Sequence, residues 1–248
     1  MELYLLTFLI VFFLSLLFSM AGTGAGIAII PILHFLGVPF NLAKPLGLFS
    51  GFITTSTSSV LNFKRGALQI KRLLPLALTL LVAAPLGAQL SRFVDVRVVK
   101  WLFVFFLIFS ASMILFYKKE PKLHLQTPWI LALAGSTVGL LSGLLGVGGG
   151  NILLPILIFL GFAPKETAIA VSFVVPFSAL ASFLSYLSFV QMDWMLLLCC
   201  GLGAVAGSSI GNHLMFFKLS AAQVKKLIAF ILYLLALKMG YTLIKGAI

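Results

Sequence analysis

The sequence predicts an all-α polytopic membrane protein made of two homologous five-segment halves, which we expect to be inverted repeats. Composition is the first observation: of 248 residues, 62% are hydrophobic and 9% are charged. An average soluble domain is about 45–50% apolar and about 25% charged, so this chain could not cover its surface with polar groups in water. The second observation is that apolar stretches of about twenty residues recur along the chain, each long enough as a helix to cross a bilayer. Soluble enzymes are therefore excluded.

The third observation is an internal repeat. The glycine-rich run Gly22–Gly26, followed by Pro31, returns 124 residues later as Gly146–Gly150, followed by Pro155. Three further pairs match at this offset or one residue beyond it: Gly37 with Gly161, Gly87 with Gly211 and Ala43 with Ala168. We therefore expect two repeats, residues 1–124 and 125–248, which form one integrated membrane domain and are joined by the polar run Lys118–Thr127. Such doubled units are common in secondary transporters.

Each half contains five apolar segments that are expected to be helices. In the first half they span residues 2–21, 27–37, 45–63, 73–91 and 98–117, and in the second half 128–145, 151–162, 167–190, 194–216 and 226–245. The second segment of each half is short, because about twelve helical residues rise only about 18 Å and a hydrocarbon core is about 30 Å thick. A glycine-rich lead of about five extended residues adds about 16 Å. The lead and the half-helix could therefore make one crossing, or the pair could dip into the membrane and return.

The distribution of Lys and Arg favours crossing. If the short segments dip and return, the loops divide these residues eight to eight between the two faces, where Lys238, inside the last segment, is left out of this count and the next. If the short segments cross, eleven lie on one face and five on the other, which is a positive-inside bias. The larger group is Lys64, Arg65, Lys71, Arg72, Lys118, Lys119, Lys122, Lys165, Lys218, Lys225 and Lys226, and the smaller group is Lys44, Arg92, Arg97, Lys100 and Lys245. We therefore favour ten segments with both termini on the outer face.

The two glycine-rich breaks are the predicted substrate site. Irregular backbone at membrane depth is tolerated only where it is buried in protein or lines a cavity. A half-helix begins after each break, and its free N–H groups and positive dipole end suit an anion, which glycines allow to approach closely. The alternative is that these glycines only permit close helix packing. The residues of the breaks that are expected to contact the anion are Gly22, Thr23, Gly24, Gly26, Gly146, Gly148, Gly149, Gly150 and Asn151.

Hydroxyl side chains form a second candidate lining in the third segment of each half. We expect Thr54, Thr57 and Ser182, which aligns with Thr57, to contact the anion. Hydroxyl groups can donate hydrogen bonds to an anion, but they also bond to carbonyls of their own helix or to a neighbouring helix. Four basic residues are candidates for coupling or gating, with ordinary packed or interfacial roles as the alternative: His34, His213, Lys44 and Lys165.

The remaining polar residues argue against several function classes. The five acidic residues lie at the chain start or between apolar segments, so no carboxylate is expected at mid-membrane to carry a proton or a cation. The net charge of +12 comes from short clusters rather than one basic patch, and no nucleic-acid partner is expected. Cys199 and Cys200 are adjacent and are expected to be packing residues; no spacing indicates a metal site or a cofactor.

The sequence resembles the TauE/SafE family. The resemblance is carried by the run Ser142–Pro155, by Gly161 and Lys165–Ala168 and by the pair Asp193–Trp194, and it extends over essentially the whole chain. The first repeat departs from the family pattern, because Gly22–Gly26 lacks an unbroken triple glycine. The resemblance implies a multi-pass protein of the bacterial cytoplasmic membrane that exports a small sulfur-containing oxyanion such as sulfite, a sulfonate or thiosulfate. Its expected partners are this anion and the lipid bilayer.

These observations together predict a secondary transporter. In the expected mechanism an anion binds between the N-termini of the two half-helices, and the two halves rock to open the site to either side. The alternatives are an anion channel, a carrier for another small anion, and a membrane scaffold that assembles partner proteins. An intramembrane enzyme would need a nucleophile, a base and an orienting carboxylate at depth, and the carboxylate is missing.

Overall fold

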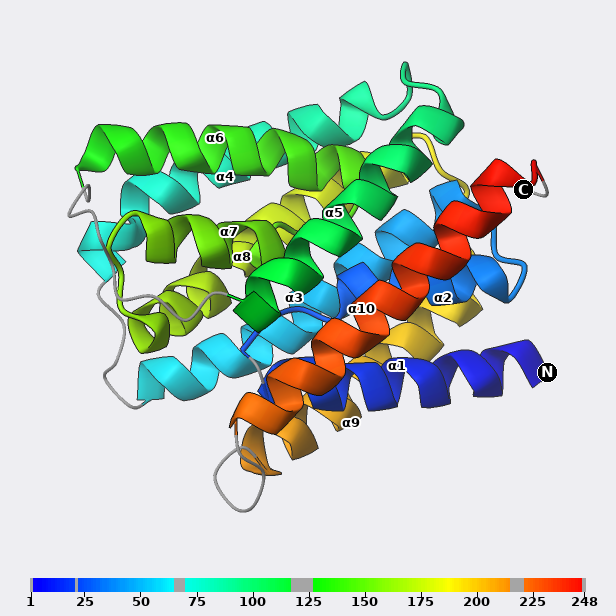
Figure 1. Cartoon of the computed structure of the whole chain (residues 1–248), viewed down its shortest axis with the longest axis horizontal. Coiled ribbons are helices and arrows are strands. Elements are labelled where there is room, and N and C mark those ends of the chain that lie inside the picture. Colours follow the sequence, from blue (N-terminus) through cyan, green and yellow to red (C-terminus); the bar gives the residue numbers. More distant parts are fainter. Residues whose placement is uncertain (1, 21, 65–69, 117–126, 215–220, 247–248) are drawn as a thin grey trace.

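The computed structural model describes residues 2–20, 22–64, 70–116, 127–214 and 221–246. Within these ranges the chain forms ten α-helices and no strand, which confirms the all-α fold (Figure 1). The helices are α1 (Glu2–Met20), α2 (Gly26–Phe35), α3 (Phe40–Lys64), α4 (Ile70–Leu90), α5 (Val96–Phe116), α6 (Pro128–Leu145), α7 (Gly150–Phe159), α8 (Pro164–Leu187), α9 (Trp194–Leu214) and α10 (Ala221–Ile244). Each corresponds to one predicted apolar segment. The predicted linker Lys118–Thr127 and the boundary between the repeats lie outside the described residues, except for Thr127.

Four helices begin three or more residues earlier than the apolar pattern predicts. α3 begins at Phe40 rather than residue 45, α4 at Ile70 rather than residue 73, α8 at Pro164 rather than residue 167, and α10 at Ala221 rather than residue 226. A first turn that carries proline or polar residues is not apolar enough to be recognised as helix from the sequence. Such residues are nevertheless tolerated there, because the first N–H groups of a helix have no internal partner. As a consequence Lys44, which the sequence places before a helix, lies inside α3.

Seven helices in the described part of the chain are long and apolar enough to cross a membrane. They are α1, α4, α5, α6, α8, α9 and α10. α2 and α7 have ten residues each, and a rise of about 15 Å is too short for either to cross alone. α3 has 25 residues, but Lys44 and the hydroxyl-rich run Thr54–Ser59 make it more polar than these seven. The chain is therefore a multi-pass membrane protein.

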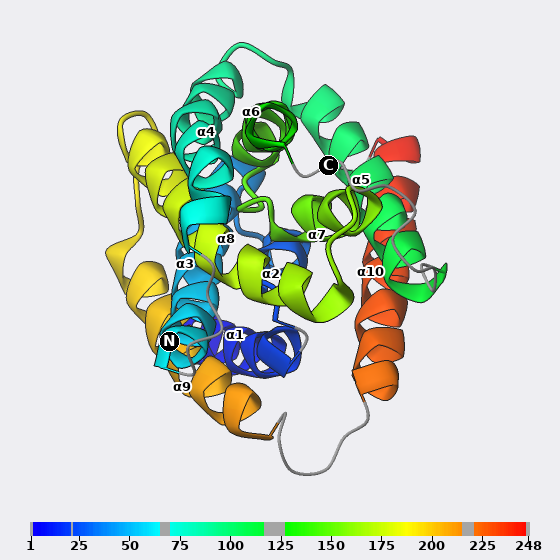
Figure 2. The ribbon, with the colours of Figure 1, turned by 90° about the vertical axis from the view of Figure 1, so that its left-hand side faces the viewer.

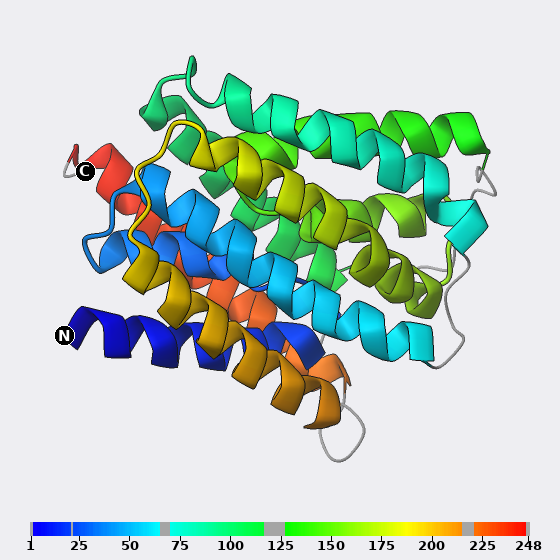
Figure 3. The same ribbon diagram turned by 180° about the vertical axis from the view of Figure 1, so that it is seen from behind.

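The two short helices lie in the middle of the bundle (Figure 2). The longer helices surround them, with α4 beside α6, α1 beside α9 and α5 beside α10. On the face seen in Figure 3, α4, α8, α3 and α9 lie side by side in that order. Ile27, Ala28, Ile29 and Ile30 of α2 have no exposed surface. The segments that follow the glycine-rich breaks are therefore part of the protein interior.

The helix contacts occur in matched pairs. α1 packs on α9 as α6 packs on α4, α3 packs on α9 as α8 packs on α4, and α10 packs on α2 as α5 packs on α7. Two further pairs, α3 with α8 and α5 with α10, join equivalent helices of the two halves. Exchanging the first five helices for the last five therefore leaves this contact pattern unchanged. The pattern supports two structurally related halves, and their inversion across a membrane stays a prediction.

One end of the bundle, which we call the terminal end, holds the start of α1, the end of α10 and three loops (Figure 1). These loops are residues 36–39, 91–95 and 188–193. The Tyr4 hydroxyl of α1 donates a hydrogen bond to Asp193 at 3.4 Å, and residues of all three loops line one pocket. α2 thus ends at the end of the bundle where α1 begins. This path supports the interpretation that a break and its half-helix together make one passage.

Glycines bring two helix pairs into close contact. In α6, Gly135, Gly139 and Gly143 lie against α4, and in α9, Gly203, Gly207 and Gly211 lie against α1. A methyl group on Gly143 would overlap the carbonyl oxygen of Ala84, and one on Gly207 would overlap that of Phe12. Small residues spaced four apart allow helix backbones to approach in this way in membranes.

We expect Gly143→Ala and Gly207→Ala to destabilise the protein by about 1–3 kcal/mol, because each new methyl group must push two helix backbones apart. Thermal unfolding of the detergent-purified protein measures the change. Gly240→Ala in α10 is the matched control, since its methyl group would lie 3.7 Å from Val104, an ordinary contact. Equal melting temperatures for all three variants would contradict the packing role of the α6 and α9 glycines.

Candidate functional site

The first break lies against α3 and is shaped by its glycines. Gly22 has a φ of +73°, a left-handed conformation that glycine adopts readily. A methyl group on Gly26 would lie 2.6 Å from the carbonyl oxygen of Gly47 in α3, so only glycine fits there without displacing the backbone. Gly24 lies beside Thr55 of the same helix, where a methyl group would have a contact of 3.4 Å. Thr23 is buried.

The second break contains three left-handed glycines. Gly146, Gly148 and Gly149 have φ values of +77°, +73° and +82°, and all of them are buried. The carbonyl oxygen of Gly148 accepts a hydrogen bond of 2.9 Å from the Ser178 hydroxyl of α8. This break is thus held on α8 as the first is held on α3.

Each break also contacts the other half of the chain. A methyl group on Gly22 would lie 3.4 Å from the Cβ of Ala168 in α8, and one on Gly146 would lie 2.6 Å from the Cβ of Lys44 in α3. Gly148 faces Leu48, the residue after Gly47. The packed pair of α3 and α8 therefore holds both breaks, and the structure brings the predicted break residues together there.

The N–H groups at the start of both short helices have no acceptor in the part of the chain that the structure describes. No side chain caps α2 or α7, and the first backbone hydrogen bonds of each are donated by later residues, Ala28 and Ile152. The four unpaired N–H groups of each break occupy equivalent positions, namely Gly24, Ala25, Gly26 and Ile27 in the first and Gly148, Gly149, Gly150 and Asn151 in the second. Buried backbone N–H groups are ordinarily paired, so these two sets are available to a ligand.

Two buried side chains add unpaired polar atoms. The Asn151 side-chain oxygen and the Ser182 hydroxyl have no hydrogen-bond partner among the described residues, although their residues are only 5% and 1% exposed. Asn151 is in the first turn of α7, and Ser182 is one turn along α8 from Ser178, which bonds the second break. Four other buried side-chain atoms have no hydrogen-bond partner among the described residues: Thr7 Oγ1, His34 Nε2, Ser110 Oγ and Asn212 Nδ2.

The hydroxyl groups of α3 have partners within the protein. Thr54 donates to the carbonyl of Ser50 at 2.8 Å and contacts the Ser15 hydroxyl of α1 at 3.3 Å. Thr57 donates to the carbonyl of Ile53 at 2.9 Å and accepts a bond of 3.3 Å from a serine of α9. These bonds hold α3 against α1 and α9. Contact of Thr54 and Thr57 with an anion stays a prediction.

The four basic candidates lie in different places. His34 and Lys44 both lie beside the Phe40 ring, near the terminal end; the His34 ring is 5.5 Å from it and the Lys44 ammonium 5.2 Å. His213 is exposed in the last turn of α9, at the opposite end. Lys165 belongs to the first turn of α8, and its side chain lies outside the described structure.

Lys44 differs from the interfacial residue that the sequence suggests, because it has no exposed surface. Its ammonium donates to the Ser91 hydroxyl at 3.1 Å. The early start of α3 explains the difference, since the first turn of that helix packs inside the bundle. The sequence alone could not identify Ser91 as a candidate site residue, because its contact with Lys44 joins positions 47 residues apart.

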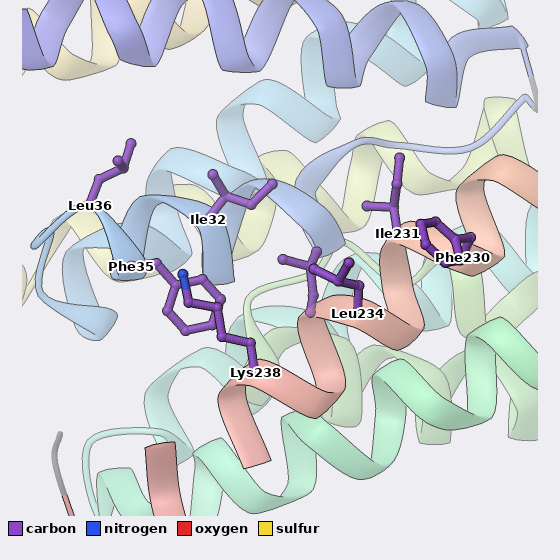
Figure 4. A pocket seen from close by; sticks show the side chains of 8 residues that line it. Ile32, Phe35, Leu36, Phe230, Ile231, Leu234 and Lys238 are labelled. Atoms are coloured by element: carbon purple, nitrogen blue, oxygen red, sulfur yellow. The ribbon is translucent and has the colours of Figure 1, made fainter. Parts of the chain in front are cut away.

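Two of the pockets in the described chain contain basic residues and lie outside the breaks. At the terminal end, a pocket of about 510 Å³ is lined by residues of α3 and of the three loops, including Asn41, Ser91 and Arg92. An apolar groove of about 350 Å³ lies between α2 and α10 (Figure 4). There the Lys238 ammonium lies 4.2 Å from the Phe35 ring. Neither pocket includes a residue of a break.

Comparison with known proteins agrees with this architecture. Residues 7–239 match the sequence model of a family described as sulfite exporter TauE/SafE. A probable membrane transporter protein of Methanocaldococcus jannaschii is 32% identical over 192 residues, covering 71% of this chain and 70% of the relative. A probable membrane transporter protein of a Sinorhizobium species is 27% identical over 246 residues, covering 95% and 92%. One from Bacillus subtilis is 25% identical over 222 residues, covering 78% and 81%.

No solved structure matches the chain. The family match extends from α1 to α10 and includes both breaks. The chain therefore belongs to the TauE/SafE family of membrane transporters.

Proposed function

We propose that this protein is a secondary transporter that moves a small sulfur-containing oxyanion, of the sulfite, sulfonate or thiosulfate class, across the bacterial cytoplasmic membrane. The observation that carries the proposal is the pair of breaks with four N–H groups each that have no acceptor among the described residues. The family description supplies the sulfur chemistry of the substrate.

The breaks suit an anion for two physical reasons. Free N–H groups at a helix start point along the axis toward the ligand, and the helix dipole places partial positive charge there. The interior also lacks competing negative charge in the described chain, because Glu2, Asp95 and Glu166 are exposed and Asp193 is half-buried in a loop. An oxyanion has several acceptor oxygens and could therefore use amides from both breaks.

The matched helix contacts support alternating access. Both breaks contact α3 and α8, the central pair that joins equivalent helices of the two halves. If the halves rock against each other, this pair is where their relative motion would open the anion site first to one side and then to the other. A membrane potential that is negative inside would favour export of the anion.

An anion channel is the alternative with the same lining. A conducting pore needs a water-filled path, whereas Gly146–Gly149 are buried. The occluded breaks favour a carrier. Counterflow of labelled against unlabelled anion in proteoliposomes distinguishes the two, because a channel shows none.

The first functional prediction concerns Asn151 at the start of α7. We expect Asn151→Asp to reduce saturable sulfite or thiosulfate flux in proteoliposomes by roughly tenfold or more, because the carboxylate would bond the free amides itself and repel an anion. Asn151→Leu, which adds no charge, should retain more flux than Asn151→Asp.

The matched control is Gln223→Glu, the same amide-to-carboxylate change in the first turn of α10, where the side chain is exposed. It should transport like the wild type. Wild-type flux in Asn151→Asp would mean that the anion does not approach the start of α7. Absence of flux for sulfite, thiosulfate and a small sulfonate in the wild type would overturn the proposed substrate class.

The second functional prediction separates a ligand-binding hydroxyl from a structural one. Ser182→Ala should weaken apparent anion affinity in the flux assay without lowering the melting temperature, because it removes a buried hydroxyl that has no partner among the described residues. Ser58→Ala should lower stability by about 1–3 kcal/mol, since the Ser58 hydroxyl donates to the Asn212 side chain at 3.1 Å. A loss of stability in Ser182→Ala with unchanged affinity would assign Ser182 to packing.

A further inference from the structure

Lys44 is a buried cation with little to neutralise it. Its side chain has no exposed surface, and its ammonium has one hydrogen bond in the described structure, to the Ser91 hydroxyl at 3.1 Å. The rings of Phe40 and Tyr186 lie 5.2 and 5.8 Å from the ammonium. An ammonium has three N–H donors, so two of them have no acceptor among the described residues.

The groups around Lys44 add positive charge. The ammonium of Lys100, a residue only 6% exposed, lies 5.6 Å from the same Phe40 ring, and Arg92 follows Ser91 in the chain. No carboxylate of the described chain reaches Lys44: Asp95 accepts from the Arg97 N–H, and Asp193 from Tyr4 and from its own helix start. Burying a cation without a counter-charge costs several kcal/mol. An anion bound beside Lys44 would supply this counter-charge.

The position of Lys44 connects two features of the molecule. On one side, its partner Ser91 lines the 510 Å³ pocket at the terminal end. On the other, Gly146 of the second break is so close that any side chain there would overlap the Cβ and Cγ of Lys44. The Lys44 side chain therefore extends from the second break, which its Cβ and Cγ contact, to Ser91 of the pocket, which its ammonium contacts.

We propose that the Lys44 ammonium is a binding site for the transported oxyanion, occupied between the terminal-end pocket and the glycine-rich breaks. This inference rests on the proposed function. It adds a charged group to the anion path, because the amides of the breaks are neutral. The anion replaces Ser91 as the partner of Lys44, and its negative charge compensates the buried cation. Lys100 and Arg92 raise the positive potential near Lys44.

The test compares Lys44→Met with Lys238→Met, which removes an exposed lysine from a ring contact in the α2–α10 groove. The first readout is the melting temperature of the purified protein without anion and with sulfite, thiosulfate, sulfate or chloride, since a bound ligand raises it. The second is saturable flux in proteoliposomes. Lys44→Met should not lower the melting temperature without anion, because an apolar side chain of similar length replaces an uncompensated charge.

In Lys44→Met we expect the anion-induced stabilisation to disappear and the half-saturating concentration for flux to rise roughly tenfold or more, as for loss of a charged hydrogen bond. Lys238→Met should keep both at the wild-type level. If Lys44→Met does not fold, Lys44→Gln, which retains a donor for Ser91 but no charge, makes the same comparison. Wild-type stabilisation and half-saturation in the neutral variant would overturn the Lys44 site and leave the proposed function standing. If the wild type shows neither stabilisation nor flux with any of these anions, the proposed function fails and this inference fails with it.

Discussion

The satisfaction of backbone N–H groups at membrane depth is the constraint on which this structure depends. Helices satisfy these groups internally, and an interruption within a bilayer requires either protein partners or a ligand. The chain interrupts itself twice, at equivalent positions, and encloses both interruptions between α3 and α8. The long helices around them then have to shield the breaks from lipid, and the glycine contacts of α6 with α4 and of α9 with α1 allow these outer pairs to approach closely.

The glycines of this chain meet three different physical demands. Gly22, Gly146, Gly148 and Gly149 adopt left-handed backbone angles, Gly26 lies against a carbonyl oxygen of α3, and Gly207 lets two long helices touch. A side chain fails for a different reason in each case: torsional strain, a clash within the site, or separation of helices. All three look the same in a sequence, which is why the repeat can locate the breaks but cannot assign a role to each glycine.

The helices and the breaks could be predicted because both depend on local sequence. Apolar length and the recurrence of Gly-Pro spacing located all ten helices. The errors lie at the helix ends: polar or proline-bearing first turns such as that of α3 were missed, and α7 and α8 end three residues earlier than predicted. Partners distant in sequence could not be predicted. The pairing of Lys44 with Ser91 and that of Thr57 with a serine of α9 depend on how helices pack across the two halves. Lys44 was expected at an interface because a lysine near a helix start is usually exposed, and the fold buries it instead.

A transporter has to hold its substrate firmly enough to select it and weakly enough to release it. Neutral amides meet the second requirement, because they surround an anion without a fixed opposite charge. They are weaker at drawing an anion out of water, since an ion loses its hydration on entering a low-dielectric interior. A single ammonium beside the amides would offset that loss. It would not add a full charge at the central site. In this arrangement the two breaks govern passage through the middle of the bundle, and Lys44 binds the anion at the terminal end, which is the predicted outer face and therefore the exit for an exported anion.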